Sequence, residues 1–492
     1  MRRALTFFGF FILFVLSSVA QKTTTNGPKT EIGDDPRLSL VSVDDKYLFF
    51  CSTDKGFNDS YDDMYITVYD KEKSSVVIEH EIDEDFLFKT AYMQDDNVVL
   101  MGSKYNNKTK SVEYFQCSFP VMGKTPRKFI KTVTYSVPAE NSILVFAEIV
   151  WSPDHTKMAF VTYTRPQNSK TKSYSIDVKI CSTDGTELMK AQRQQDGIWP
   201  MGKTIFLTNN ATAYVIEERT ISKFDENPKE ELGLEIKTKD RIYRYLTITS
   251  SGEFASPVYS DIQMIKPISA LTPKGNLYLF SETSSGVTTL EIDQQGEILW
   301  QYSFDTEFPK EPEGITYEDR EEGLRFVPIQ VLPLSDGRTI VSGTQYKRHV
   351  ESGDHIYVYY VNQSLILFLF DNNGEMSTQV LPFSYLSWDL QLSTDVPLIE
   401  WEGNAWIMYN GHKNNYGPKK SSKWETPDKH QKYCIAIIKI DDDLNFESSA
   451  LYVPPKDNIG NEYYMRIMHV SEDAVYYLKH YNGDNRIEKI TK

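Results

Sequence analysis

The feature that most constrains this chain is a strand-turn-strand pattern that recurs along almost its whole length. The best-preserved copy is Val150-Trp-Ser-Pro-Asp-His-Thr-Lys-Met-Ala-Phe-Val161, in which two apolar runs flank a polar turn. Short apolar and β-branched runs bounded by turn residues are typical of antiparallel strands. Similar stretches place their turns at Asp44, Asp95, Asp154, Asn209, Lys274, Asp336, Glu402 and Glu472.

A second hairpin signal follows several of these turns. It occurs at Thr183-Asp-Gly-Thr186, Ser250-Ser-Gly-Glu253, Gln294-Gln-Gly-Glu297 and Asn372-Asn-Gly-Glu375. Glycine after a polar residue allows the positive φ of a tight hairpin. Successive units are about 50 to 70 residues long, which suits four strands and exceeds a leucine-rich or ankyrin unit. We therefore expect an all-β fold, a β-propeller of four-stranded antiparallel blades, with eight blades favoured and seven if one hairpin belongs to an insertion.

The best-preserved hairpin also resembles a known repeat. Trp151 to Phe160 resembles the S-P-D-G-x-x-[IL]-A-[FY] hairpin of TolB-like and prolyl-oligopeptidase-type β-propellers, with His155 where those families usually have glycine. The other seven copies are degenerate. The resemblance implies a propeller fold. In prolyl oligopeptidases the propeller stands beside a hydrolase domain, and we expect no such domain here because the last hairpin lies close to Lys492.

The N-terminus is typical of a secretory signal peptide. Arg2 and Arg3 precede an apolar run over residues 4–16, and small residues end at Ala20, where we expect cleavage. We therefore predict a signal peptide over 1–20, a leader over 21–36 that is flexible or forms one short strand, and a propeller over 37–492. We expect ring closure to use a strand from about residues 28 to 40. The predicted location is secreted or periplasmic, with no membrane span because no other apolar run is long enough.

The net charge bears on the class of partner, and the cysteine content bears on the disulfide state. The formal net charge of −16 argues against nucleic acid as a partner. Cys51, Cys117, Cys181 and Cys434 are widely separated, so the sequence allows either buried thiols or two disulfides.

Catalytic motifs give little support to an enzyme. The sequence has no G-x-S-x-G nucleophile elbow and no H-E-x-x-H pair, and we predict no cofactor and no metal site. The weak catalytic candidates are acidic residues near the expected tunnel: Glu148, Asp389, Asp395 and Glu400. Pairs of carboxylates from different blades can cleave glycosidic bonds, so the alternative function is a carbohydrate-active hydrolase or lyase. A second alternative is a structural component of a cell-envelope assembly.

The loops indicate a binding face. In antiparallel blades, the loops between the second and third strands and the connections between blades leave from one face. The longer loops (54–63, 105–111, 163–173, 346–355 and 411–432) all fall on that face. The candidate ligand-binding residues there are Arg165, Lys170, Lys172, Tyr346, Lys347, Arg348, Tyr416, Lys419, Lys420 and Trp424.

Basic and aromatic side chains of this kind favour a protein or glycan ligand, including an anionic one. The alternative is that these lysines only keep the protein soluble. Our leading prediction is a soluble binding module without catalysis. The turn at Asp154 and His155 falls on the opposite face, so we interpret Trp151 to Phe160 as a structural repeat.

Overall fold

The computed structural model describes most of the chain as short strands joined by turns. No helix among the described residues is long and apolar enough to cross a membrane. The described residues are 23–24, 39–55, 61–82, 87–121, 131–167, 173–197, 200–220, 241–259, 264–283, 285–306, 325–352, 356–371, 374–387, 397–401, 404–412, 433–441, 446–452, 463–471, 474–481 and 484–491.

Seven sheets each consist of four consecutive antiparallel strands, which we name blades 1 to 7. Blade 1 is β2 (Ser39–Val43), β3 (Tyr47–Lys55), β4 (Tyr61–Asp70) and β5 (Ser75–Ile82). Blade 2 is β6 (Leu87–Gln94), β7 (Asn97–Asn106), β8 (Ser111–Pro120) and β9 (Lys131–Pro138). Blade 3 is β10 (Ser142–Trp151), β11 (Lys157–Pro166), β12 (Ser173–Ser182) and β13 (Glu187–Asp196). Blade 4 is β14 (Gly202–Leu207), β15 (Ala213–Thr220), β16 (Arg241–Ile248) and β17 (Val258–Tyr259).

The remaining three blades repeat the same order. Blade 5 is β18 (Ile265–Leu271), β19 (Leu277–Glu282), β20 (Gly286–Ile292) and β21 (Ile298–Asp305). Blade 6 is β22 (Arg325–Pro333), β23 (Thr339–Ser352), β24 (Ile356–Phe370) and β25 (Met376–Ser387). Blade 7 is β26 (Leu398–Trp401), β27 (Asn404–His412), β28 (Tyr433–Ile440) and β29 (Phe446–Tyr452).

The last sheet, which we name the closing sheet, joins the two ends of the chain. Its order is β1-β32-β31-β30, with β1 (Thr23–Thr24), β30 (Tyr463–Val470), β31 (Ala474–Tyr481) and β32 (Asp484–Thr491). β1 pairs antiparallel with β32, with Thr23 opposite Ile490. The described strands therefore form eight four-stranded sheets, seven of them from consecutive strands.

The prediction that residues 28 to 40 supply the closing strand is wrong. The outer strand of the closing sheet is Thr23–Thr24, and Ser39–Val43 is instead the first strand of blade 1. The physical reason is that one strand cannot pair with β32 and with β3 at once. The short strand allowed for in the leader therefore does the closing.

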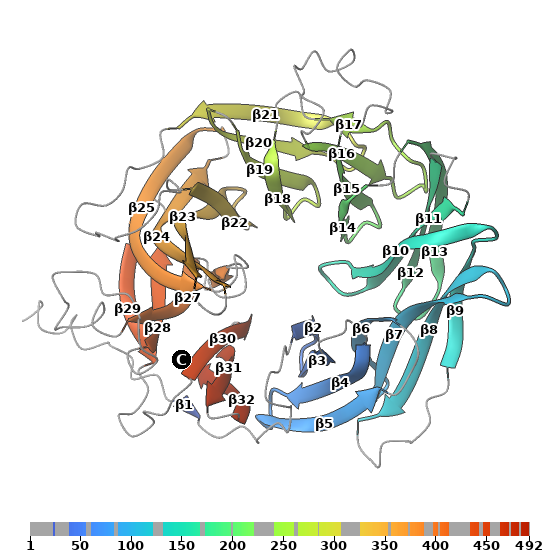
Figure 1. The fold of residues 1–492 in the computed structure, drawn as a ribbon, viewed down its shortest axis with the longest axis horizontal. Coiled ribbons are helices and arrows are strands. Elements are labelled where there is room, and N and C mark those ends of the chain that lie inside the picture. Colours follow the sequence, from blue (N-terminus) through green and yellow to red (C-terminus); the bar gives the residue numbers. More distant parts are fainter. Residues whose placement is uncertain are drawn as a thin grey trace, which may run out of the picture.

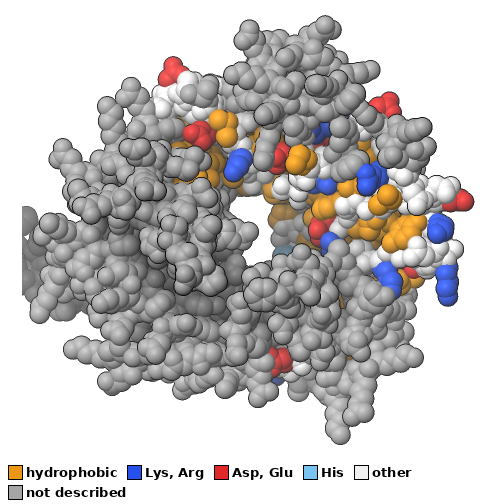
Figure 2. All heavy atoms as spheres, viewed as in Figure 1, with side chains coloured by type: hydrophobic (Ala, Val, Ile, Leu, Met, Phe, Trp, Pro, Cys, Tyr) orange, Lys and Arg blue, Asp and Glu red, His pale blue; other side chains and the backbone are white. Residues whose placement is uncertain are grey.

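The sheets stand around a central axis, as the ribbon in Figure 1 shows. Figure 2 shows an opening at the centre of the ring, with hydrophobic and charged side chains of the described blades beside it. The prediction of an all-β propeller with four-stranded antiparallel blades is confirmed. Each predicted first turn lies between the first and second strand of its sheet, and each predicted second turn lies between the third and fourth.

Burial explains why the strands differ in pattern along a blade. The second and third strands are buried on both faces; in β11 seven consecutive residues are buried, which is the continuous apolar run of a strand covered on both sides. The outer strand β13 alternates between exposed and buried residues because one of its faces meets solvent.

Apolar clusters fill the spaces between neighbouring sheets. One joins blades 3 and 4 through Val161, Ile176 and Val215, and another joins the closing sheet to blade 1 through Tyr476 and Phe50. Fully burying one such side chain contributes about 1.5–3 kcal/mol. The ring is thus held by face-to-face packing of successive sheets.

The two faces of the ring differ. The first and second hairpin turns emerge together on one face, which we name the hairpin face, and the other connections emerge on the loop-rich face. Contacts between turns of adjacent blades confirm the first grouping: the Asp154 backbone N–H donates to Asn209 Oδ1 at 3.0 Å, and Asn210 Nδ2 donates to Gln294 Oε1 at 3.4 Å.

The prediction of a loop over 346–355 is wrong, because most of this stretch is strand. β23 and β24 continue past the end of β22 as a paired ribbon, up to Ser352 opposite Ile356. Tyr357 to Val361 supply the β-branched and aromatic residues that favour a strand partner here.

Two of the four cysteines can be assigned. Cys117 and Cys181 are buried thiols, as in the buried-thiol alternative, and burial raises the pKa of the Cys181 thiol. The side chains of Cys51 and Cys434 lie outside the described residues.

Candidate functional site

The predicted ligand-binding residues fall partly within the described chain. Arg165 is the penultimate residue of β11, opposite Ile143 at the loop-rich edge of blade 3, and it is partly buried. Tyr346 lies in β23 opposite Arg325, at the same edge of blade 6, and is also partly buried. Lys347 and Arg348 continue β23 in its paired ribbon. Lys170, Lys172, Tyr416, Lys419, Lys420 and Trp424 lie outside the described residues.

Two exposed lysines add to the loop-rich face. Lys108 and Lys110 lie in the turn between β7 and β8 of blade 2 and are exposed. With Arg165 on blade 3, they place described basic side chains on two neighbouring blades of the same face.

The two weak catalytic candidates that the structure describes, Glu148 and Glu400, lie in different blades and have different partners. Glu148 in β10 forms an ion pair with Lys89 in β6, at 3.5 Å. Glu400 in β26 accepts a 2.6 Å hydrogen bond from Ser335 Oγ. β10 belongs to blade 3 and β26 to blade 7, on opposite sides of the ring in Figure 1, so the structure does not bring these two carboxylates together. Asp389 and Asp395 lie outside the described residues.

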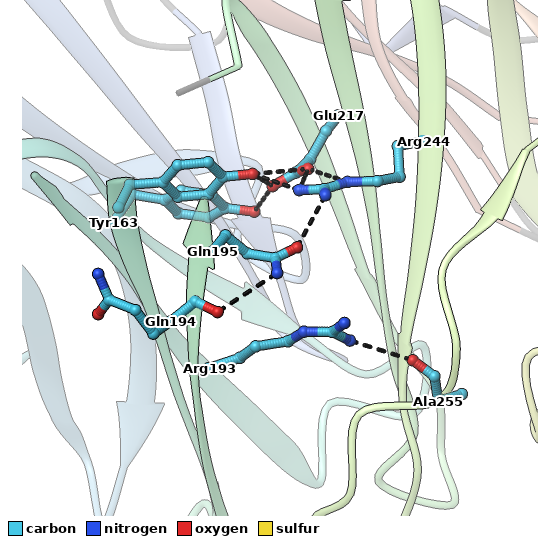
Figure 3. A network of polar contacts seen from close by, with 8 residues as sticks. Tyr163, Arg193, Gln194, Gln195, Glu217, Arg244 and Ala255 are labelled. Atoms are coloured by element: carbon cyan, nitrogen blue, oxygen red, sulfur yellow. Dashed lines mark hydrogen bonds and ion pairs between the residues drawn. The ribbon is translucent and has the colours of Figure 1, made fainter. Parts of the chain in front are cut away.

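A buried polar network joins blades 3 and 4, as Figure 3 shows. Glu217 in β15 has no exposed surface, and its Oε2 accepts a 2.8 Å hydrogen bond from Arg244 Nε on the adjacent strand β16. Arg244 Nη2 donates to the same oxygen, and this contact is also the ion pair between the two residues. Glu217 Oε1 accepts from the hydroxyl of Tyr163 at 2.9 Å and from that of Tyr174 at 3.2 Å.

Arg244 makes two further hydrogen bonds through its Nη atoms. Its Nη1 donates to Gln195 Oε1 at 2.7 Å, and its Nη2 donates to the Tyr174 hydroxyl. The rings of Tyr163 and Tyr174 stack with centroids 5.8 Å apart. Burial, followed by the neighbouring Glu217 carboxylate, raises the pKa of both tyrosines, so both hydroxyls remain donors. A fully paired network of this kind fixes how two blades fit together.

In blade 3, the equivalent cross-strand pair consists of different residues. Thr162 and Asp177 pair across β11 and β12 as Glu217 and Arg244 pair across β15 and β16. Thr162 Oγ1 lies 2.6 Å from the Tyr114 hydroxyl of blade 2. Asp177 is buried, and burial raises the pKa of its carboxyl to about 6, opposed by Lys190. Asp177 is thus a buried carboxyl with a raised pKa.

The sequence contains one further motif match, which was not recognised from the sequence alone. Residues Gly197 to Thr204 fit the phosphate-loop pattern G-x-x-x-x-G-K-[ST]. That motif needs a helix after its lysine, whereas Gly202–Leu207 is strand β14. Lys203 Nζ lies 4.9 Å from the ring centroid of Phe146 and 5.3 Å from that of Tyr163, and burial lowers its pKa. The match therefore does not describe a phosphate loop.

The hairpin face carries an open pocket of about 300 Å³. It lies over the first-strand ends of blades 1, 2 and 3, the first turns of blades 1 and 3, and the second turn of blade 3. Its lining is Val43, Asp44, Tyr92, Met93, Gln94, Trp151, His155, Thr183 and Asp184. The sequence analysis placed Trp151 and His155 on this face but gave them only a structural role.

Comparisons with known proteins find only distant structural neighbours. No protein-family model matches the chain, and no curated protein matches it. A protein from Lactobacillus plantarum is 13% identical over 83% of this chain and 97% of its own, with a TM-score of 0.37. The β-propeller domain of the Trilobed protease from Pyrococcus furiosus is 10% identical over 86% and 98%, with a TM-score of 0.35. A streptogramin B lyase is 12% identical over 77% and 92%, also with a TM-score of 0.35.

The fold itself defines the class of this protein, a β-propeller with four-stranded antiparallel blades. The distant structural neighbours include propellers of a protease and of a lyase. At TM-scores below 0.5 they carry no argument about what this chain binds or does, and the TolB-like or prolyl-oligopeptidase-type repeat stays a resemblance.

Proposed function

We propose that this chain is an exported, soluble β-propeller that binds a protein or glycan ligand through its loop-rich face and performs no chemistry. The observation that carries the proposal is the strand order. In the antiparallel sheets, every connection between second and third strands leaves from the face opposite the hairpin turns. The ring therefore presents its longer connections together on one rigid platform, an arrangement that suits binding residues.

The charge on this face supports the proposal. Arg165, Lys108 and Lys110 lie at the loop-rich edges of blades 2 and 3. They contrast with the formal net charge of −16 of the whole chain. Basic side chains on one face of an acidic protein suit an anionic glycan or an acidic protein surface. The exposed Glu140, between β9 and β10, adds an acidic side chain to the same face.

We propose further that the closing sheet counts as an eighth blade. It has the same four-stranded antiparallel order as the other sheets, and its inner residues pack on blade 1 through Tyr476 against Phe50. Seven blades is the alternative, if the two-residue β1 does not complete a working blade.

Incubation with polysaccharides tests binding against catalysis. The purified protein is mixed with neutral, uronic and sulfated polysaccharides, and one sample of each is read for retention and another for new reducing or unsaturated ends. Retention without new ends supports the binding module. Product that disappears in Glu148→Gln or Glu400→Gln overturns it in favour of a carbohydrate-active hydrolase or lyase. Co-purification in a large complex with envelope proteins would instead favour a structural component.

A further inference from the structure

The turn that holds His155 has equivalents in blades 4, 5 and 6. The backbone N–H of His155 donates to the Ser152 carbonyl, and the same bond is made by Ala211, Gly275 and Gly337 in blades 4, 5 and 6. All four residues have positive φ; that of His155 is 54°. Glycine takes this left-handed conformation without a Cβ penalty, as Gly275 and Gly337 do, so His155 carries a backbone cost that these two counterparts avoid.

The imidazole of His155 lies at the pocket on the hairpin face. His155 is exposed, and its ring centroid is 6.0 Å from that of Trp151. Trp151 is held in place, because its Nε1 donates to Thr90 Oγ1 at 3.0 Å and its ring meets the ring of Tyr92 edge-on at 5.0 Å. The aromatic wall of the pocket is therefore rigid before any ligand binds.

The polar wall of the pocket is acidic. Asp44 Oδ1 accepts bonds from the backbone N–H groups of Lys46 and Tyr47, at 2.8 and 2.6 Å. Asp184 is exposed, and hydrogen bonds from Ser182 and Thr186 lower the pKa of its carboxyl, which keeps it ionised. Among the described residues that line the pocket there are two carboxylates and neither lysine nor arginine.

Lys71 is a cation bound to the turn that holds Asp44. Lys71 Nζ donates to the backbone carbonyl of Asp44 at 2.6 Å, so it is bound to the main chain of the turn. Burial lowers the pKa of Lys71, and Asp44 and Asp45 act against this shift. The other acidic lining residue, Asp184, belongs to blade 3, whereas Asp44 belongs to blade 1.

We propose that this pocket binds an organic ammonium group, either a free amine or the lysine side chain of a peptide. Ionised carboxylates beside fixed aromatic rings are the surroundings in which an alkylammonium is stabilised, by charge and by cation–π attraction. The volume of about 300 Å³ lies at the lower end of the range for small-ligand pockets. The site lies on the face opposite the proposed ligand-binding loops and does not depend on them.

Titration calorimetry of the full chain tests the proposal, with spermidine, a tri-lysine peptide and a neutral gluco-oligosaccharide as probes at about 0.15 M salt. We expect spermidine, the peptide or both to bind, and the tighter of the two identifies the source. Asp184→Asn keeps the turn and removes the charge, so it should weaken binding at least fivefold. Asp336→Asn removes a similar turn carboxylate on blade 6 and should change affinity less than twofold.

His155→Gly gives a second readout that does not depend on charge. Glycine relaxes the left-handed backbone, so this variant should fold at least as well as the wild type, and we expect it to bind the ammonium probe more weakly. The proposal is overturned if neither ammonium probe binds, if Asp184→Asn and Asp336→Asn lose affinity equally, or if the gluco-oligosaccharide binds more tightly than both ammonium probes.

Discussion

Replacement of Arg244 by methionine isolates the energetic role of the buried network between blades 3 and 4. Methionine replaces the apolar stem of the side chain and removes every donor. Glu217, which has no exposed surface, then keeps only the hydroxyl donors of Tyr163 and Tyr174. Breaking a buried ion pair by removing one partner costs about 3–5 kcal/mol. We therefore expect Arg244→Met to lower the free energy of unfolding by that amount at neutral pH.

The matched control removes both charges. In Glu217→Leu/Arg244→Met the buried pair is replaced by apolar side chains, and such replacements are often neutral or stabilising by about 1–4 kcal/mol. The double variant should thus be close to the wild type or more stable, although it contains the same Arg244 substitution. Equilibrium urea denaturation of the three proteins, followed by tyrosine and tryptophan fluorescence, measures the difference.

A deficit of Arg244→Met relative to the wild type below about 1 kcal/mol at pH 7, or a double variant less stable than the single one, would refute the account of this network.

Three further predictions concern other parts of the ring. Burial raises the pKa of Asp177 to about 6, above the ordinary value near 3.9. The stabilising contribution of this carboxyl is therefore present at low pH and is lost as the pH rises through 6. Between pH 4 and pH 7, the free energy of unfolding of Asp177→Asn, measured in urea titrations, should rise by about 1–3 kcal/mol relative to that of the wild type. Gly286→Ala would place Cβ 2.0 Å from the Phe304 carbonyl oxygen and should cost about 2–4 kcal/mol, whereas Gly185→Ala, with no atom within 4 Å, should cost about 1 kcal/mol for its positive φ. Deletion of residues 21–36, which removes β1, should lower the thermal midpoint if the closing sheet is a working blade, and an unchanged midpoint would favour seven blades.

Repeat structure made much of the fold predictable from the sequence. The turn residues at Asp154 and Lys274 lie between first and second strands because polar and glycine-rich turns are encoded locally. The strand that closes the ring was misplaced, because pairing between Thr23 and Ile490 joins opposite ends of the chain and leaves no local pattern. The ribbon of β23 and β24 was taken for a loop because charged residues such as Lys347 interrupt its apolar run.

The candidate sites were less predictable than the fold. Glu217 and Tyr163 are 54 residues apart and belong to different blades, so their contact depends on how two sheets stack rather than on spacing along the chain. The pocket on the hairpin face likewise combines residues of three blades. One local signal was available there: His155 replaces the glycine usual in the hairpins that Trp151 to Phe160 resembles, at a position with positive φ.

The most direct test of the central claim, binding through the loop-rich face, is the affinity of the protein for defined anionic probes. Titration calorimetry with polygalacturonate, heparin and polyglutamate compares the wild type with a variant carrying Lys419→Ala, Lys420→Ala and Trp424→Ala. Lys274→Ala, which removes an exposed lysine from the hairpin face, is the control. We predict that at least one probe binds, that the triple variant binds it at least tenfold more weakly, and that the control binds as the wild type does. Equal affinity of the triple variant, or binding of none of the three probes by the wild type, would contradict the claim.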